Sequence, residues 1–335
     1  MSDSMSYKCA QLLMRAVLTA PELAINMPST NAEWEVVRRG WLKKSKLQLL
    51  SGTVGAVDGF FQRTIKPEVA NCQAFFSGHY QSYGLNCQAA CDSNLKFIYF
   101  GIIATGCTND GIAFHMADNL ANSVKNLPDG MYFVGDAAYD VTEKLLIPFT
   151  GSQRENPDND AFNYYLSQMR IWIEMSFGYL VNNFRILQGK LNCKIENNAK
   201  ILMACARLHN FIIDTRSLGE DGNDADSDSD DSDIDVDYLQ GQFDEIQIAP
   251  MNMVYLPVIP DGNGFDAMNG VCFTRMTIVD MIRENGIRRP VFNLIRNGRA
   301  AEAAAQQQQP QQDDENDGND DEAIEGVNRN YYHPN

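Results

Sequence analysis

Apolar residues recur at helical spacing through the first fifty residues of the chain. In STNAEWEVVRRGWLKK, Trp34, Val37 and Trp41 fall on one helix face, and Thr30 with Glu33 has the spacing of a capping box. Beyond this segment the pattern changes to short apolar runs bounded by turn residues, which is typical of β-strands. These runs are TVGAVDG, YGLNCQAACD, KFIYFGIIATG and MYFVGD.

Helical patterns return between and after these runs. NDGIAFHMADNLANSVK predicts a helix capped by Asn109 or Asp110. Longer helical stretches follow over about residues 160–187 and 197–214. Strands first and mostly helices later, with crossovers between the strands, predict a layered α/β domain.

One acidic residue interrupts the pattern of the longest helix. In MRIWIEMSFGYL (169–180), Glu174 lies three residues from Ile171 and three from Phe177, so it is expected on their apolar side. A carboxylate there is costly to desolvate unless a cation meets it. Arg170, one turn earlier, could pair with Glu174 or reach a phosphate, and a metal ion is the other candidate partner.

Two aspartates occupy matching positions, each after an apolar strand and before a turn. They are Asp58 in VGAVDG and Asp136 in YFVGDAAY. Either one alone is commonly a turn former or a helix cap. Together with Glu174, however, they could converge on one point. Crowded carboxylates repel one another and are stable mainly around a divalent cation, for which Mg²⁺ is the best candidate. Two such ions can activate water and stabilise the leaving oxygen of a phosphodiester.

The net charge of −17 is concentrated in two segments. Residues 219–240 carry ten acidic side chains and residues 313–325 carry eight, and neither segment has a Lys or Arg. These eighteen charges exceed the net charge by one, so the rest of the chain is close to neutral. Like-charge repulsion and few apolar residues predict disorder for both.

The acidic segments suggest a division of the chain into five parts. We expect a helical N-terminal segment (1–50), an α/β domain (51–216), an acidic disordered linker (217–240), a small C-terminal module (241–298) and a Gln/Asp-rich disordered tail (299–335).

Cysteine usage and hydropathy constrain the compartment. Eight cysteines are scattered without a CxxC pair, which favours reduced thiols in a nuclear or cytosolic protein. No run of eighteen apolar residues appears, so no membrane span is expected, and the first residues do not resemble a secretion signal. The basic segment RRGWLKKSK (38–46) suits a phosphate contact, a nuclear import signal or a solvated helix.

Six strings of the sequence occur in the order found in one protein family. They are VGAVDGFFQRTIKP, FFSGHYQSYGLNCQAACD, GCTNDGIAF, FVGDAAYDVTEKLLIPF, RIWIEMSFGYLVNNFRIL and ARLHNFI. Over about residues 20–215 the chain resembles the DDE transposase domain of the PIF/Harbinger superfamily, including its domesticated nuclease-like relatives. Thirty-seven residues separate Asp136 from Glu174, close to the family's spacing between its second Asp and its Glu.

The resemblance implies an RNase H-like fold, with a central mixed β-sheet flanked by helices. It also implies that Asp58, Asp136 and Glu174 form the catalytic, metal-binding triad, with Mg²⁺ or Mn²⁺ as the cofactor. Similar enzymes hydrolyse DNA at transposon ends and join the free 3′ hydroxyl to target DNA. The implied activity is therefore that of a metal-dependent DNA endonuclease or transposase.

The chain departs from the family pattern in two places. After the first aspartate, Gly59, Phe60 and Phe61 stand where relatives usually carry Gly-Thr-His. In the segment beginning GCTNDG, Asp110 is retained, either as the cap of the following helix or as a fourth acidic residue near the site.

The length of the N-terminal region bears on the expected partners. Only 57 residues precede Asp58, whereas relatives usually carry a helix-turn-helix module well before it, so we expect this module to be missing or reduced to remnants. The resemblance thus implies help from a separate Myb-like DNA-binding protein and a location in the nucleus, with the cytoplasm and homo-oligomer formation left open. Two other functions stay open: a domesticated, catalytically silent module for DNA or protein interaction, and an RNase H-like hydrolase of RNA–DNA hybrids.

Overall fold

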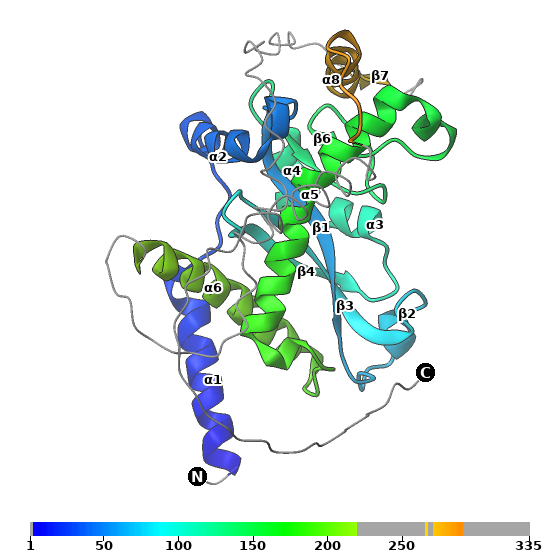
Figure 1. The fold of residues 1–335 in the computed structure, drawn as a ribbon. Coiled ribbons are helices and arrows are strands. Elements are labelled where there is room, and N and C mark those ends of the chain that lie inside the picture. Colours follow the sequence, from blue (N-terminus) through cyan, green and yellow to red (C-terminus); the bar gives the residue numbers. More distant parts are fainter. Residues whose placement is uncertain (1–2, 220–264, 267–270, 291–335) are drawn as a thin grey trace, which may run out of the picture. The chain divides into compact units, whose positions relative to one another are not determined.

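A computed structural model of the chain describes residues 3–219, 265–266 and 271–290 (Figure 1). Most of both acidic segments and the Gln/Asp-rich tail lie outside these residues. The helices are α1 (Asp3–Thr19), α2 (Asn31–Lys44), α3 (Asp110–Met116), α4 (Asp118–Lys125), α5 (Pro157–Asn183), α6 (Ile195–Gly219) and α8 (Phe273–Glu284). The strands are β1 (Thr53–Arg63), β2 (Phe76–Ser77), β3 (Ser82–Cys91), β4 (Phe97–Thr105), β5 (Tyr132–Val134), β6 (Leu145–Leu146), β7 (Phe265–Asp266) and β8 (Val271–Cys272).

A mixed sheet with β1 at its centre organises the domain (Figure 1). β1 pairs antiparallel with β3, and β3 pairs antiparallel with β4 and β2. On its other side β1 pairs parallel with β5, which pairs parallel with β6. The predicted α/β class, with a central mixed sheet flanked by helices, is confirmed, and the arrangement is consistent with an RNase H-like fold.

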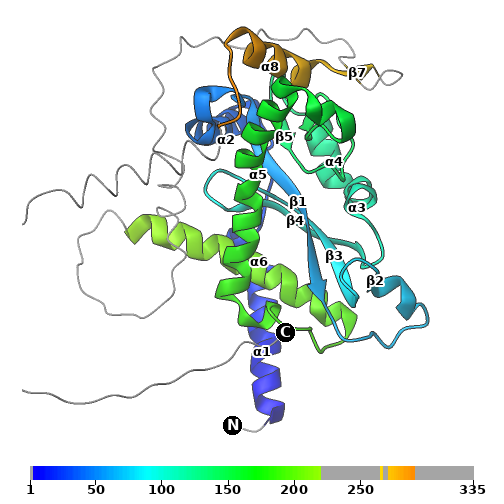
Figure 2. The same ribbon diagram turned by 45° about the vertical axis from the view of Figure 1, so that its right-hand side comes forward.

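Helices cover both faces of this sheet because alternate strand residues point to opposite sides. Ala56 of β1 belongs to the apolar cluster that includes α5, whereas its neighbour Val57 belongs to a second cluster with α4. In Figure 2, α5 runs along the sheet on the side opposite α3 and α4.

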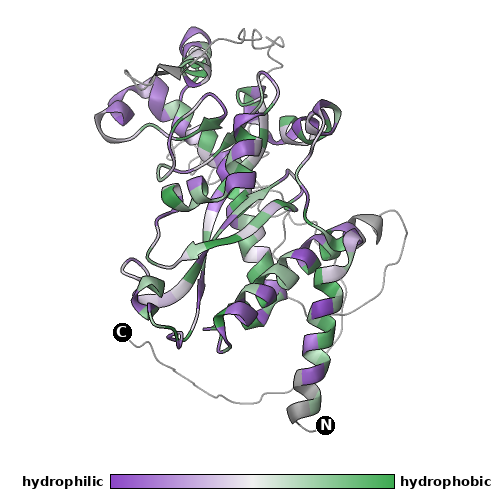
Figure 3. Cartoon of the chain, turned by 180° about the vertical axis from the view of Figure 1, so that it is seen from behind, coloured by the Kyte–Doolittle hydropathy of each residue, from purple (hydrophilic) through white to green (hydrophobic). Residues whose placement is uncertain are grey.

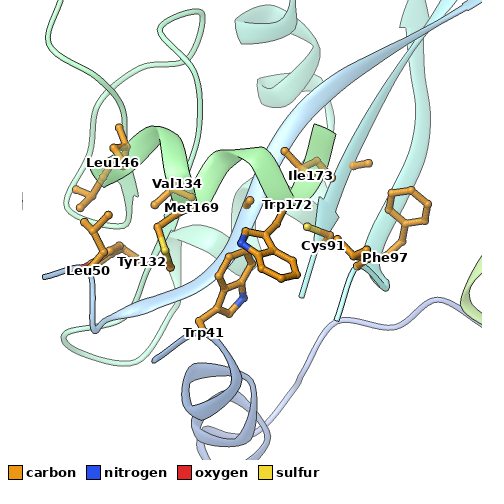
Figure 4. Packing of buried hydrophobic residues seen from close by; sticks show 14 of the residues in the cluster. Trp41, Leu50, Cys91, Phe97, Tyr132, Val134, Leu146, Met169, Trp172 and Ile173 are labelled. Atoms are coloured by element: carbon orange, nitrogen blue, oxygen red, sulfur yellow. The ribbon is translucent and has the colours of Figure 1, made fainter. Parts of the chain in front are cut away.

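The two tryptophans of α2 connect this helix to both clusters. The Trp41 ring meets Trp172 of α5 edge to face, with ring centroids 6.3 Å apart, and Figure 4 shows the two side by side. The Trp34 ring meets Phe133 of β5 in the same way at 6.0 Å. The helix begins with the predicted capping box, since Thr30 accepts from the Glu33 backbone N–H. Trp34 and Trp41 are both buried, so the predicted common face of this helix is confirmed.

Two predicted elements differ in extent from their sequence patterns. The helix expected over NDGIAFHMADNLANSVK is divided at Ala117 into α3 and α4. The run TVGAVDG was expected to end at Asp58, but β1 continues to Arg63. It continues because residues 59–63 pair with β3, a long-range partner that a local pattern does not reveal.

Side chains from the α/β domain fix the N-terminal end of α8. The Glu143 carboxylate accepts hydrogen bonds from the backbone N–H groups of Phe273 and Thr274, at 2.6 and 2.8 Å. Helix α8 packs against α5 within one compact unit that extends from Met1 to Arg289. Only residues 265–266 and 271–290 of the proposed module at 241–298 are described, and the predicted domain boundaries remain predictions.

Helix α1 is amphipathic and packs against α6. Arg207 of α6 donates from Nη1 to the carbonyls of Val17 and Leu18, at 3.2 and 2.8 Å. Purple and green bands alternate along α1 in Figure 3, and two leucines on it, Leu12 and Leu13, remain mostly exposed. None of the described helices is long and apolar enough to cross a membrane.

Candidate active site

Asp58 and Asp136 lie at the point where β1 and β5 stop pairing. The last residues paired between these parallel strands are Ala56 and Val134. Asp58 comes two residues after Ala56, and Asp136 comes two residues after Val134. Because parallel strands run in the same direction, equal offsets bring the two carboxylates to the same edge. Asp58 is thus in the interior of β1 and not at its end, as the apolar run suggested, but it is at the end of the parallel pairing.

The environment of Asp58 confirms that the acidic groups are close together. Burial raises the pKa of Asp58 to about 7; the Gly59 backbone N–H and the Arg170 charge lower it, and the charges of Asp136 and Asp110 raise it further. Asp58 Oδ1 accepts the Gly59 N–H at 2.8 Å. A carboxyl with this pKa is partly protonated near neutral pH, and an approaching cation would favour its ionised form.

Helix α5 brings a cation to this edge. Phe60 of β1 packs on Phe177 of α5, with ring centroids 5.1 Å apart, so α5 lies over the face of β1 on which Asp58 stands. On the same helix, Arg170 Nη2 donates to Glu174 Oε1 at 3.2 Å. Arg170 is mostly buried, and its Nε has no hydrogen-bond partner among the described residues. Arg170 therefore serves both acidic groups: it pairs with Glu174 and its charge acts on Asp58.

Glu174 lies outside the buried face of α5, contrary to the helical pattern. Its side chain is 55% exposed, and Ile171 and Phe177 are only half-buried. The apolar face that packs on the sheet is formed by Phe162, Tyr165, Leu166, Met169, Trp172, Ile173 and Leu180. The expected desolvation of Glu174 was wrong because the stripe through Ile171 and Phe177 runs along the margin of this face. Its partner in the structure is Arg170.

Asp110 is a further acidic group at this edge. Asn109 caps α3, since its Oδ1 accepts the Ile112 N–H at 2.8 Å, so Asp110 is not the cap. Instead, Asp110 Oδ1 accepts from Asn86 Nδ2 at 2.9 Å and from Gln88 Nε2 at 3.3 Å. Burial raises the pKa of Asp110, and the two amides lower it in part.

Glycine at position 59 makes room for Asp110. A Cβ on Gly59 would lie 2.0 Å from Asp110 Oδ1, a distance that no side chain could adopt without displacing the carboxylate. The residue that follows Asp58 therefore allows Asp110 to approach the backbone of β1.

Two residues that the sequence reasoning missed complete this hydrogen-bond network. Gln88 is fully buried, and its Oε1 accepts from the hydroxyl of Tyr139 at 2.9 Å. Tyr139 follows Asp136 by three residues, so this bond links the Asp136 loop to β3. A signal was present in YGLNCQAACD, because Asn86 and Gln88 are polar in an otherwise apolar strand and buried polar groups need partners.

The proposed ligands are of the type that hard divalent cations prefer, namely carboxylate oxygens. The described residues nevertheless include no group of three or more His, Cys, Asp or Glu side chains arranged to hold a metal ion. The structure thus brings Asp58 and Asp136 to one edge and leaves Glu174 with Arg170. The assignment of Asp58, Asp136 and Glu174 as a catalytic triad remains a prediction.

The segment that carries these residues is similar to one protein family. Residues 57–210 match the family model of DDE superfamily endonucleases. The matched segment begins in β1, ends in α6 and contains all three predicted triad residues. No curated protein and no solved structure matches the chain. The match supports the DDE superfamily, whose members are nucleases and transposases that act on DNA and generally use divalent metals, while the PIF/Harbinger subtype rests on the sequence strings.

Proposed function

We propose that this chain is a divalent-metal-dependent DNA endonuclease or transposase of the PIF/Harbinger type. Asp58, Asp136 and Glu174 are its proposed catalytic residues. The observation that supports this most strongly is the position of the two aspartates, at equal offsets from the last β1–β5 pair, inside a segment that matches DDE superfamily endonucleases.

The proposed cofactor is Mg²⁺ or Mn²⁺, held by the carboxylates of Asp58, Asp136 and Glu174. When bound, such an ion supplies charge stabilisation to a reacting phosphodiester and a more acidic bound water. The chain itself contributes acceptor oxygens at the edge of β1 and β5. Glu174 Oε1 would have to give up its bond to Arg170 Nη2 to join them, which makes Arg170 part of how this site is assembled.

The proposed partners are DNA and a Myb-like DNA-binding protein, and the proposed location is the nucleus. The basic segment 38–46 supports these proposals in part. Trp41 within it is buried and packs on Trp172, so its ring belongs to the core and only the basic side chains of the segment can contact DNA. The Lys44 ammonium lies 4.3 Å from the centroid of the Trp172 ring. Backbone-only contacts should give the isolated chain weak, salt-dependent and sequence-indifferent DNA binding.

The test combines cleavage with metal binding. Asp58→Asn, Asp136→Asn and Glu174→Gln should each lower Mg²⁺-dependent DNA cleavage by orders of magnitude. The rise in melting temperature on adding Mn²⁺ should also shrink in each variant, because a cation that binds the folded state stabilises it. Asp140→Asn is the matched control, since this exposed carboxylate lies four residues from Asp136.

The alternative function, a domesticated and catalytically silent interaction module, gives a different result. The parent would then bind DNA, yet it would neither cleave DNA nor show a metal-dependent rise in melting temperature. A parent that cleaves RNA–DNA hybrids in preference to DNA would instead indicate an RNase H-like hydrolase.

A further inference from the structure

An exposed aromatic stack lies beside the candidate active site. The Tyr80 and Phe61 rings are nearly parallel, with an interplanar angle of 10° and centroids 4.3 Å apart. Tyr80 is 47% exposed, so the outer ring of this stack is open to solvent. A partly exposed aromatic ring offers a flat π-face on which another planar ring can stack.

The inner ring of the stack rests on backbone. A Cβ on Gly84 would lie 2.3 Å from Phe61 Cζ, and one on Gly106 would lie 2.9 Å from Phe61 Cε2. Two glycines, one on β3 and one just after β4, therefore let the Phe61 ring lie flat against the sheet. Phe61 therefore gives the stack a floor of strand backbone, and Tyr80 forms its outer, partly exposed ring.

A hairpin turn presents the outer ring. Phe76 and Ser77 of β2 pair with Tyr83 and Ser82 of β3, which leaves residues 78–81 as the connecting turn. The Tyr80 N–H donates to Ser77 Oγ at 3.3 Å. Figure 1 shows β2 beside one end of β3. The His79 ring of this turn meets the Tyr80 ring edge to face, with centroids 4.7 Å apart, and the Tyr80 side chain still remains 47% exposed.

The stack is close to the acidic edge. Phe61 is three residues beyond Asp58, about 10 Å along an extended strand, and lies on the opposite sheet face, the face on which Gly59 meets Asp110. Burial raises the pKa of Tyr80, and the charges of Asp110 and Asp58 raise it further, while Arg63 lowers it. Tyr80 thus lies within electrostatic range of both the carboxylates and a cationic side chain.

We propose that the Tyr80–Phe61 stack is a platform for one unpaired nucleobase of a DNA substrate held at the acidic edge. The proposal rests on the proposed DNA substrate. A nucleobase is the occupant that this surface fits, because it offers a flat π-face to Tyr80 while the backbone phosphates beside it can meet Arg63. Inside a duplex both faces of each base are covered, so only an unpaired or extruded base can stack there.

The test uses the full chain and a fluorescent base, without divalent metal so that nothing is cleaved. The probe is a DNA duplex with 2-aminopurine at a single-base bulge, compared with the fully paired duplex of the same sequence. The parent should bind the bulged duplex at least about tenfold more tightly and quench its fluorescence, as stacking on an aromatic side chain would give.

Substitutions at Tyr80 separate stacking from folding. Tyr80→Leu keeps apolar contact with Phe61 but removes the ring, and it should lose both the quenching and the preference for the bulge. Tyr80→Phe should keep both. Phe211→Ala is the matched control, because Phe211 is 49% exposed and lies on α6, and it should behave as the parent does.

Each outcome decides the proposal. A Tyr80→Leu variant with the parent's preference and quenching would overturn it. So would a parent that binds both duplexes equally well, although that result would leave the DNA endonuclease function standing. A parent that binds neither duplex would overturn the DNA substrate and the platform together.

Discussion

Arg170 carries the positive charge that Asp58 and Glu174 share in the absence of metal. A cation that binds Glu174 Oε1 must first break the Arg170–Glu174 pair. Because Glu174 is more than half exposed, that pair is worth about 0.5 kcal/mol, which corresponds to about a twofold change in affinity.

Arg170→Gln should therefore bind Mn²⁺ at least about twofold more tightly than the parent. Its metal-free melting temperature should fall, because Asp58 loses a compensating charge. Melting curves over a range of Mn²⁺ concentrations measure both effects, with Arg185→Gln, an exposed arginine just beyond α5, as the control. Weaker Mn²⁺ binding by Arg170→Gln would show instead that Arg170 organises the metal ligands.

His209 makes a second residue-level prediction, about pH. The ring is fully buried, Nε2 lies 2.8 Å from the Leu95 carbonyl, and burial lowers the pKa of His209 to about 4. The unfolded chain takes up this proton near pH 6.5, before the folded protein does. The neutral His209 ring therefore makes its full contribution to the free energy of unfolding above pH 6.5, and this contribution is lost as the pH falls towards 4.

The expected loss from this histidine is about 3 kcal/mol across that range. Denaturant unfolding of the parent and of His209→Asn at pH 7, 5.5 and 4.5 measures it. The parent should lose more stability than the variant on acidification, whatever the variant's stability at pH 7. Parallel loss in both proteins would mean that the imidazole is protonated in the folded state.

At the scale of elements, the Glu143 carboxylate holds the N-terminus of α8 by accepting hydrogen bonds from two of its backbone N–H groups. A twelve-residue helix is marginal on its own, so α8 depends on its contacts with the α/β domain. Glu143→Ala removes the acceptor for two backbone N–H groups at the start of the helix, at a cost of about 1 kcal/mol.

Hydrogen exchange should accelerate in residues 273–284 of that variant and stay unchanged in β1 and β3. Glu155→Ala, an exposed glutamate before α5, is the control. Unchanged exchange in α8 would show that Asp158, which accepts from Arg283 and Arg288 at 2.9 and 2.6 Å, is enough to hold the helix.

The elements also show how far sequence patterns extend. Apolar runs predicted β1, β3, β4 and β5 because their side chains are buried within the strand itself. The continuation of β1 past Asp58 and the break at Ala117 were not predicted, since both depend on distant partners. Position along the chain predicted that Asp58 and Asp136 lie together. The one-turn spacing offered the Arg170–Glu174 pair as one alternative, but it could not choose that pair over a metal ion, because the helix margin is defined only by packing.

At the scale of the whole molecule, charge separates the α/β domain from the acidic segments. Residues 219–240 and 313–325 together carry eighteen acidic groups, whereas the rest of the chain is close to neutral. Tethered negative charge could occupy a phosphate-binding surface at high effective concentration. Alternatively, these segments are linkers that only keep the chain soluble.

Deletion of residues 219–237 and 313–325 distinguishes the two roles. If the acidic segments compete with DNA, the deleted chain should bind a DNA duplex about tenfold more tightly at low salt. The gain should disappear at high salt, because screening weakens both the competition and the DNA contacts. Gly/Ser segments of the same length, in place of the acidic ones, are the control that preserves the tether. They should reproduce the tighter binding, since only charge has been removed. Equal affinity of all three proteins across the salt range would leave the acidic segments as linkers.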